Sequence, residues 1–475
     1  MGFRPVLSGG RRRVVRVWRR IFGLSWPVMV EQILRTLMRT TDVAVTGLFS
    51  PAAVAAVGLA DLYARLPLRI GLGLGSGVIA LSSQDTGSGE TANRNEAITQ
   101  AVILGALAGI PFVLFGLVFG QGAIRLLGAE WEVARMGGIY LAIIFATSPA
   151  RHVALVASRS VQGAGDTRTP MYVNAVSNAL NIAGTIVLGL GIGPVPQFGI
   201  VGVGLATAFG NVFSALALVA AIRSPYTPVD FARPHQWTIT KQLLAISAPR
   251  ILEGMLTFVM EFPFNAILLL FGTEVNAAYQ IGRRVYQQIT APLSRGYRTG
   301  TSIVVGQALG DGDPGGARYN GWAAAGLGLL TVGSLGAVLF VGAEWLVTFF
   351  TDDPETLRYA GGFARAYAVA APFTALYVVL AGALTSGSDT RTPLVGRVTG
   401  MFVGMLGVSY VVGVRAGYGV PAVYASIVVY YLWATIYVAV GFHRGAWIER
   451  TRDMMDERES TPDGDRTSED GYSDN

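Results

Sequence analysis

The pentapeptide Asp-Thr-Arg-Thr-Pro occurs twice in the chain, starting at Asp166 and again at Asp389. Small residues precede it both times, and Pro149 recurs as Pro372 at the same separation. A repeat of this length indicates an internal duplication, which constrains the architecture before any single residue is interpreted. Each copy reads as a helix connection, because Asp and small residues end one helix and Pro fits the first turn of the next. The sequence therefore predicts two halves with the same plan.

The chain is too apolar for a soluble protein of 475 residues. Hydrophobic residues make up 52% and charged residues 14%, whereas roughly a quarter of the residues in soluble domains are charged. The composition therefore predicts a polytopic membrane protein. The chain has no cysteine, which excludes disulfides, thiolate metal sites and cysteine nucleophiles. Its net charge of +6 lies in loops and at the amino end, so membrane topology explains it better than nucleic-acid binding.

Apolar stretches of about 20 residues, long enough to cross a bilayer, can be placed six times in each half. The sequence predicts an all-α protein with twelve transmembrane helices in two six-helix bundles. Because six is even, both bundles enter the membrane from the same side, as parallel repeats. The expected division is a basic amino-terminal segment, an amino lobe, a cytoplasmic linker, a carboxyl lobe and an acidic disordered tail, at residues 1–20, 21–222, 223–241, 242–442 and 443–475.

Charge is distributed unevenly between the two ends of these spans. The amino terminus, both pentapeptide loops, the linker and the region after the last span are basic, whereas the opposite loops carry Glu130, Glu132, Glu344, Asp352 and Asp353. Because basic loops stay on the inner side of a membrane, both termini are expected in the cytoplasm. The expected location is the cell membrane, and the expected state is a monomer.

Several motifs together carry a family resemblance that covers nearly the whole chain. They are Thr41-Asp42, the stretch Gln162 to Thr167, the pair Asn178 and Asn181, and the stretch Gly202 to Thr207. With the duplicated loop, they resemble the MATE family of multidrug and toxin extrusion antiporters. The resemblance implies the MATE fold and export of organic cations, drugs or other amphipathic compounds by alternating access of two lobes. It implies Na⁺ or H⁺ as the coupling ion, no cofactor, and a small-molecule substrate and the lipid bilayer as partners.

The same resemblance implies a cation-coupling site in the amino lobe. Its residues would be Asp42, Asn178, Asn181 and Thr207, with Thr185 where prokaryotic relatives commonly carry a second acid. A carboxylate at mid-bilayer costs roughly 2.5 to 3.5 kcal/mol and is retained mainly for function. Asp42 is therefore expected to bind H⁺ or, with neutral oxygens around it, Na⁺. The alternative is a buried ion pair between Asp42 and Arg39, three residues earlier on the same helix.

In the carboxyl lobe, the resemblance makes Glu253 and Glu261 candidates for a second coupling acid. Arg250 precedes Glu253 by three residues, so a structural ion pair is the alternative there, whereas Glu261 has no basic neighbour one turn away. Aromatic residues nearby are candidates for a cleft that holds flat cations by cation–π contact, with core packing as the alternative. These are Phe258, Phe262 and Tyr279.

Two other functions remain open. A lipid-linked oligosaccharide flippase of the same broader superfamily would have a cationic cavity, for which the candidate residues are Arg65, Arg69, Arg151, Arg283, Arg284 and Arg365. An enzyme would require a cluster of His with Asp or Ser at one membrane interface. The three histidines are scattered and show no metal-ligand spacing, so neither an enzyme nor a resident metal site is expected.

Overall fold

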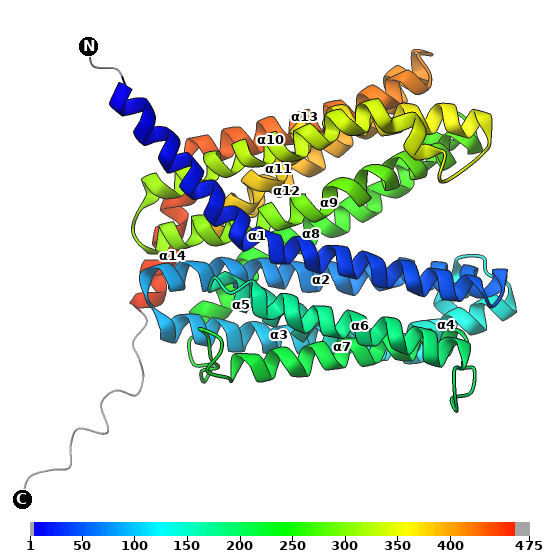
Figure 1. Cartoon of the computed structure of the whole chain (residues 1–475), viewed down its shortest axis with the longest axis horizontal. Helices are drawn as coiled ribbons and strands as arrows, with labels where there is room; N and C mark the ends of the chain where they lie inside the picture. Colours follow the sequence, from blue (N-terminus) through cyan, green and yellow to red (C-terminus); the bar gives the residue numbers. More distant parts are fainter. Residues whose placement is uncertain (1–3, 461–475) are drawn as a thin grey trace, which may run out of the picture.

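The computed structural model describes residues 4–460, and all the regular structure in that range is helical (Figure 1). The first half contains α1 (Arg4–Gly47), α2 (Pro51–Ser88), α3 (Thr91–Leu126), α4 (Trp131–Ala146), α5 (Ser148–Gly163), α6 (Arg168–Leu190) and α7 (Ile200–Ile222). The second half contains α8 (Trp237–Leu269), α9 (Thr273–Gly310), α10 (Pro314–Val347), α11 (Pro354–Ser386), α12 (Arg391–Thr399) and α13 (Val420–Arg444). A last helix, α14 (Ala446–Glu459), follows.

Within residues 4–460, nine helices are long and apolar enough to cross a membrane, and a bent pair raises this to ten. The pair is α4 and α5, which meet at 47°. Pro149 lies in the first turn of α5, where a missing N–H does no harm. Helix α12 continues through two π-helical segments, Gly400–Gly407 and Ser409–Arg415, as one span. The chain is therefore a multi-pass, all-α membrane protein, as predicted.

Helices α1 and α9 lie at the two remaining predicted spans, but arginines interrupt their apolar character and neither is among the ten. Both are long, with 44 and 38 residues, and they lie against each other in the bundle. Charged residues inside a membrane bundle face its interior or a water-filled cavity and commonly mark a transport pathway. Helices α1 and α9, with arginines inside predicted spans, are therefore candidates for the functional part of the bundle.

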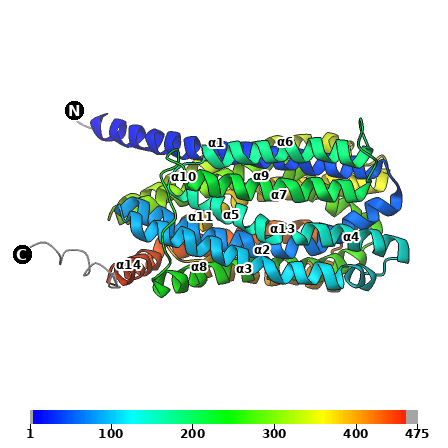
Figure 2. The ribbon, with the colours of Figure 1, turned by 90° about the horizontal axis from the view of Figure 1, so that it is seen from below.

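Each half of the chain contributes the first part of one helix to the core of the other half. Ile21 and Met29 of α1 belong to the core of the carboxyl lobe, whereas Ile239 and Leu243 of α8 belong to a core of the amino lobe. Trp18 Nε1 also donates a hydrogen bond to the carbonyl oxygen of Ala323 on α10, at 2.7 Å. Figures 1 and 2 show the start of α1 and α14 at the same end of the bundle, called the terminal end below.

The lobes touch closely at the terminal end because glycines line the contact between α2 and α9. A Cβ added to Gly87 would collide with the backbone of Gln307, and one added to Gly310 would collide with the backbone of Gln84. Gln84 Nε2 donates to the carbonyl oxygen of Ser386 at 2.6 Å, which ties α2 to the end of α11. The structure is therefore closed between the lobes at this end.

The boundaries of the linker and the tail differ from those predicted. Helix α8 begins at Trp237, inside the predicted linker, and Glu96 of α3 accepts hydrogen bonds from the backbone N–H groups of His235 and Gln236, both at 2.6 Å. The prediction of disorder from residue 443 is wrong for α14. The ring of Trp447 stacks on Phe442 at 4.9 Å, which anchors this polar helix. Residues 461–475 and 1–3 lie outside the described part of the chain.

Both pentapeptide loops lie at the terminal end, so cysteine labelling can test the predicted orientation. Arg168 and Arg391 are exposed at the start of α6 and α12, and the chain has no cysteine of its own. We expect Arg168→Cys and Arg391→Cys to react only with reagents that reach the cytoplasm, because the basic loops lie there. Glu132→Cys, exposed at the opposite end, should react from outside. Labelling of the first two positions from opposite sides would contradict the parallel repeat.

Candidate cation-coupling site

Asp42 lies on α1 in the half that packs against α6. Its side chain is 8% exposed, and Thr185 Oγ1 on α6 donates a hydrogen bond to its Oδ1 at 2.7 Å. Within residues 4–460, Oδ2 makes no hydrogen bond, so it is the oxygen left for a proton or a metal cation. Thr185 stands where the family resemblance implies a second acid. Its hydroxyl group gives the Asp42 carboxylate a neutral polar partner instead.

The polar contacts continue from α6 to α7. Asn181 Oδ1 lies 3.4 Å from Thr185 Oγ1, and Asn181 Nδ2 donates to Thr207 Oγ1 at 3.1 Å. Thr207 in turn donates to the carbonyl oxygen of Val203 at 3.2 Å. The structure thus brings four of the five predicted residues into one chain of contacts across α1, α6 and α7. Asn178 is buried one turn away on α6 but takes no part in the chain.

The alternative role for Asp42, an ion pair with Arg39, is not found in the described part of the chain. Arg39 is exposed, and the hydrogen-bond partner of Asp42 is Thr185. Arg39 still acts electrostatically on Asp42 without forming an ion pair, and so does the carboxylate of Asp61 of α2, which the sequence prediction omitted. Asp61 is an acid inside an apolar stretch, which is the signal that should have identified it. Carboxylate, hydroxyl and amide oxygens suit hard cations such as Na⁺, and a carboxylate also suits H⁺.

Glu253 in the carboxyl lobe is held by two arginines. Its Oε2 lies 2.5 Å from Arg250 Nη1, and its Oε1 lies 3.2 Å from Arg397 Nη1 of α12. Tyr377 Oη also donates to Oε1, at 3.1 Å. The side chain of Glu253 is 1% exposed. The structural alternative raised from the sequence, pairing with Arg250, is therefore present, and it leaves this carboxylate little capacity for a further cation.

Glu261 is also paired, contrary to the expectation from its neighbours on α8. Arg283 Nη2 of α9 lies 2.6 Å from Glu261 Oε1. The partner comes from another helix, so a search at helical spacing on α8 alone could not find it. Both second-lobe candidates are thus bound to arginine, and only Asp42 among the predicted acids has neutral partners.

Loss of the Glu253 carboxylate should destabilise the fold and leave the coupling of transport to the ion intact. We expect Glu253→Gln to lower the free energy of unfolding by about 2 kcal/mol, because a charge-assisted hydrogen-bond network loses its acceptor charge. Thermal unfolding in detergent, followed by tryptophan fluorescence, measures this. The control is Glu344→Gln, whose ion pair with Arg365 is largely exposed and should contribute less than about 1 kcal/mol. Normal stability with lost ion coupling would instead make Glu253 a coupling residue.

Comparison with known proteins decides the family. The family model described as MatE matches residues 27–187 and 249–411, one match in each half of the chain. The chain belongs to the MatE family. MatE proteins are membrane transporters and not enzymes. Each matched segment lies within one of the two predicted lobes.

Two relatives match most of the length of this MatE protein. A probable multidrug resistance protein NorM from Bradyrhizobium diazoefficiens is 29% identical over 84% of this chain and 88% of its own. A protein of the same description from Thermotoga maritima is 25% identical over 94% of this chain and 97% of its own.

Solved structures share the fold. An outward-facing multidrug resistance MATE family transporter has a TM-score of 0.81 and 21% identity, covering 92% of this chain and 96% of its own. A MOP superfamily transporter from Pyrococcus furiosus has a TM-score of 0.81, 19% identity and the same coverage. At these identities the likeness concerns the fold alone, and it confirms the predicted MATE fold.

The aromatic candidates of this MatE protein do not form one cleft. Tyr279 is only 2% exposed, and its ring packs against Phe264 at 5.1 Å and Phe363 at 5.5 Å inside the carboxyl lobe. Phe258 and Phe262 contact each other edge to face on α8, at 5.4 Å. Tyr279 is thus a core residue in this conformation, which matches the packing alternative, and its place in a substrate cleft stays a prediction.

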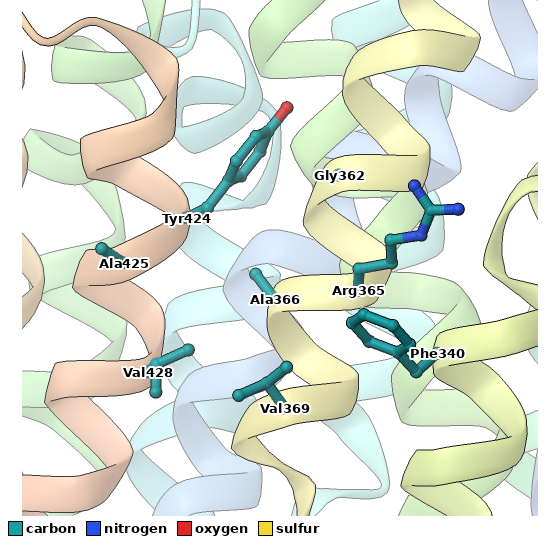
Figure 3. Close-up of a pocket in the computed structure, with 8 residues that line it drawn as sticks. All are labelled: Phe340, Gly362, Arg365, Ala366, Val369, Tyr424, Ala425 and Val428. Atoms are coloured by element: carbon teal, nitrogen blue, oxygen red, sulfur yellow. The ribbon is translucent and has the colours of Figure 1, made fainter.

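An open groove of about 320 Å³ lies on the carboxyl lobe, away from the Asp42 site. Figure 3 shows Phe340, Arg365 and Tyr424 around it, with apolar side chains below. Arg365 lies 2.9 Å from Glu344, on α10. This arginine, one of the candidates for a cationic central cavity, therefore belongs to the outer part of one lobe and not to the contact between the lobes.

Proposed function

We propose that this MatE protein is a secondary active antiporter that exports amphipathic small molecules in exchange for Na⁺ or H⁺ bound at Asp42. The observation that carries the proposal is the chain of polar contacts from Asp42 through Thr185 and Asn181 to Thr207, in which Thr185 donates its one hydroxyl proton to Asp42 and Asn181 donates to Thr207. It is a buried carboxylate with neutral oxygen partners in a helix that also contacts the other lobe. The relatives from Bradyrhizobium diazoefficiens and Thermotoga maritima are described as probable multidrug resistance proteins, which supports drugs among the exported compounds.

Helix α1 offers a physical route from ion binding to lobe movement. Its Asp42 end packs on the amino lobe, whereas Trp18 at its other end is bonded to α10 of the carboxyl lobe. A cation at Asp42 neutralises a buried charge and favours the conformation in which the carboxylate is enclosed. Release of the cation removes that preference, so one helix can bias how the two lobes meet. Both lobes belong to one chain, which supports a monomer as the working unit.

The proposal is tested by efflux from proteoliposomes in which Na⁺ and pH gradients are imposed separately. An inward gradient of the coupling ion should drive efflux of an amphipathic fluorescent compound, and collapse of that gradient should stop it. Efflux that responds to neither gradient would refute secondary active antiport. Efflux that responds to only one identifies the coupling ion.

A flippase for lipid-linked oligosaccharides is the second candidate. It is favoured by the arginines on helices of both lobes, because a lipid pyrophosphate is an anion that guanidinium groups bind well. Movement of a labelled lipid phosphate between leaflets, with no ion dependence and no efflux of soluble compounds, would favour this candidate over the antiporter.

A further inference from the structure

Arginines from both lobes gather where the lobes meet. Arg295 of α9 donates to Gln32 of α1, and Arg159 of α5 donates to Thr299 of α9 at 2.7 Å. The side chain of Arg69 on α2 lies against Gly254 of α8, close enough that a Cβ there would touch it at 3.0 Å. The interlobe arginine cluster is defined here as Arg35, Arg69, Arg159, Arg250, Arg295, Arg298 and Arg397, each within electrostatic range of others in the set.

Carboxylates compensate only part of this charge. Glu31 pairs with Arg35 at 3.0 Å, and Glu253 pairs with Arg250 and Arg397. Arg159, Arg295 and Arg298, however, donate to the neutral side chains of Thr299, Gln32 and Thr385. Nε of Arg69 and Nε of Arg397 are buried and have no partner in the described part of the chain. Glu261, Glu31 and Glu253 also lie within electrostatic range of Arg69, Arg159 and Arg298, respectively. These three carboxylates face seven arginines, so the cluster retains positive charge and unused donors.

Such an arrangement is unfavourable unless something binds there. Charged side chains within a bundle are costly, and those without a partner mark substrate or ion pathways. Like charges on facing helices also repel one another across the lobe contact, more strongly than in water because the local dielectric is low. A permanent organic cation would add to this repulsion, whereas an anion would reduce it. Guanidinium groups, moreover, match the geometry of carboxylate and phosphate oxygens.

We propose that the compounds exported between the lobes are organic anions, carrying a carboxylate or phosphate group that binds the interlobe arginine cluster. This assignment rests on the proposed function and names its substrate class. The amphipathic body of the substrate packs on the apolar parts of α1, α8 and α9, and its anionic group contacts Arg69 and Arg295. The anion is bound when the lobes separate on one side and is released when they separate on the other.

The test compares two xanthene dyes of opposite charge, carboxyfluorescein and rhodamine 6G, in phosphatidylcholine proteoliposomes that hold the full chain. Ion-driven efflux of carboxyfluorescein should exceed that of rhodamine 6G by about tenfold, the factor that one charge-assisted contact supplies. A third arm follows NBD-labelled phosphatidic acid by dithionite quenching, and transport of this lipid in place of the soluble dye identifies the anion as a lipid headgroup. Ion-driven transport of either anion supports the proposal, whereas movement of the lipid without ion dependence would favour the flippase and overturn both the antiporter proposal and the anion assignment.

Variants of Arg69 test whether its guanidinium group contacts the transported anion. Arg69→Gln should reduce anion transport by about tenfold, since one guanidinium contact is lost, and Arg69→Glu should reverse the preference between the two dyes. The matched control is Arg358→Gln, at an arginine whose side chain is 70% exposed outside the cluster, which should transport as wild type. Melting temperatures establish that each variant is folded.

Two further results would overturn the anion assignment. If an ion gradient drives rhodamine 6G and neither anionic probe, the antiporter proposal stands and the substrate class is wrong. If none of the three probes moves under either gradient, the proposed function is wrong, and the anion assignment falls with it.

Discussion

Asp42→Asn should insert and fold normally but lose ion-driven efflux, with the initial rate of efflux reduced by about 100-fold or more. The reason is that the coupling ion no longer shifts the equilibrium between the conformations of the two lobes. Asparagine keeps the size of the side chain, and its amide oxygen can still accept the hydrogen bond from Thr185 Oγ1, which spans 2.7 Å in the structure. It cannot bind a proton at neutral pH, and it brings no negative charge to Na⁺. The rate is measured in proteoliposomes, with melting temperature as the check on folding.

Thr185 supplies the matched controls for this experiment. Thr185→Ser keeps the hydroxyl group and should retain efflux, whereas Thr185→Val removes the donor and should weaken the apparent affinity for the coupling ion by about tenfold. Retained ion-driven efflux in Asp42→Asn, together with its loss in Glu261→Gln, would place the coupling site in the carboxyl lobe. That result would require Glu261 to exchange its partner Arg283 for a cation during transport.

The parts of this protein that could be predicted from sequence are those encoded locally. The duplicated pentapeptide predicted two parallel halves, and the structure places the start of α6 and of α12 at that motif. Asp42 was identifiable because an acid in an apolar helix is unusual. Its partners Thr185, Asn181 and Thr207 came from the family resemblance, and the observed contacts at 2.7 to 3.4 Å connect all four.

Contacts between distant segments were not predictable in the same way. The pairing of Glu261 with Arg283 joins two helices, whereas sequence spacing reports only neighbours on one helix. Ile21 of α1 packs in the core of the carboxyl lobe, and this contact depends on how the two lobes lie against each other, which local sequence does not encode. Helix α14 was missed because its sequence is polar, and its burial depends on Trp447 and Arg458 rather than on an apolar stripe.

Arg458→Ala should open the terminal end of the lobes. Arg458 of α14 is 2% exposed, its Nη2 lies 2.9 Å from Asp85 Oδ1 of α2, and its Nη1 donates to Gln242 Oε1 of α8 at 2.5 Å. Both partners lie on the amino-lobe side, whereas α14 is anchored in the core of the carboxyl lobe by Trp447, so this side chain joins the two lobes. Removal of the guanidinium leaves Asp85 as an uncompensated buried charge, which costs about 3 to 5 kcal/mol in the closed state. Water reaches Asp85 when the lobes separate, so the equilibrium moves toward the open conformation.

Spin labels on Arg168→Cys and Arg391→Cys, which are exposed in opposite lobes at the terminal end, report this change as a longer interlabel distance. Arg452→Ala is the matched control, because Arg452 lies on the same helix and its side chain is 83% exposed in a weak pair with Asp456. The double variant Arg458→Ala/Asp85→Asn should recover part of the closed population, since the buried charge is gone and the two changes are not additive. An unchanged distance distribution in Arg458→Ala would mean that the glycine-lined contact of α2 with α9 holds the lobes closed without α14.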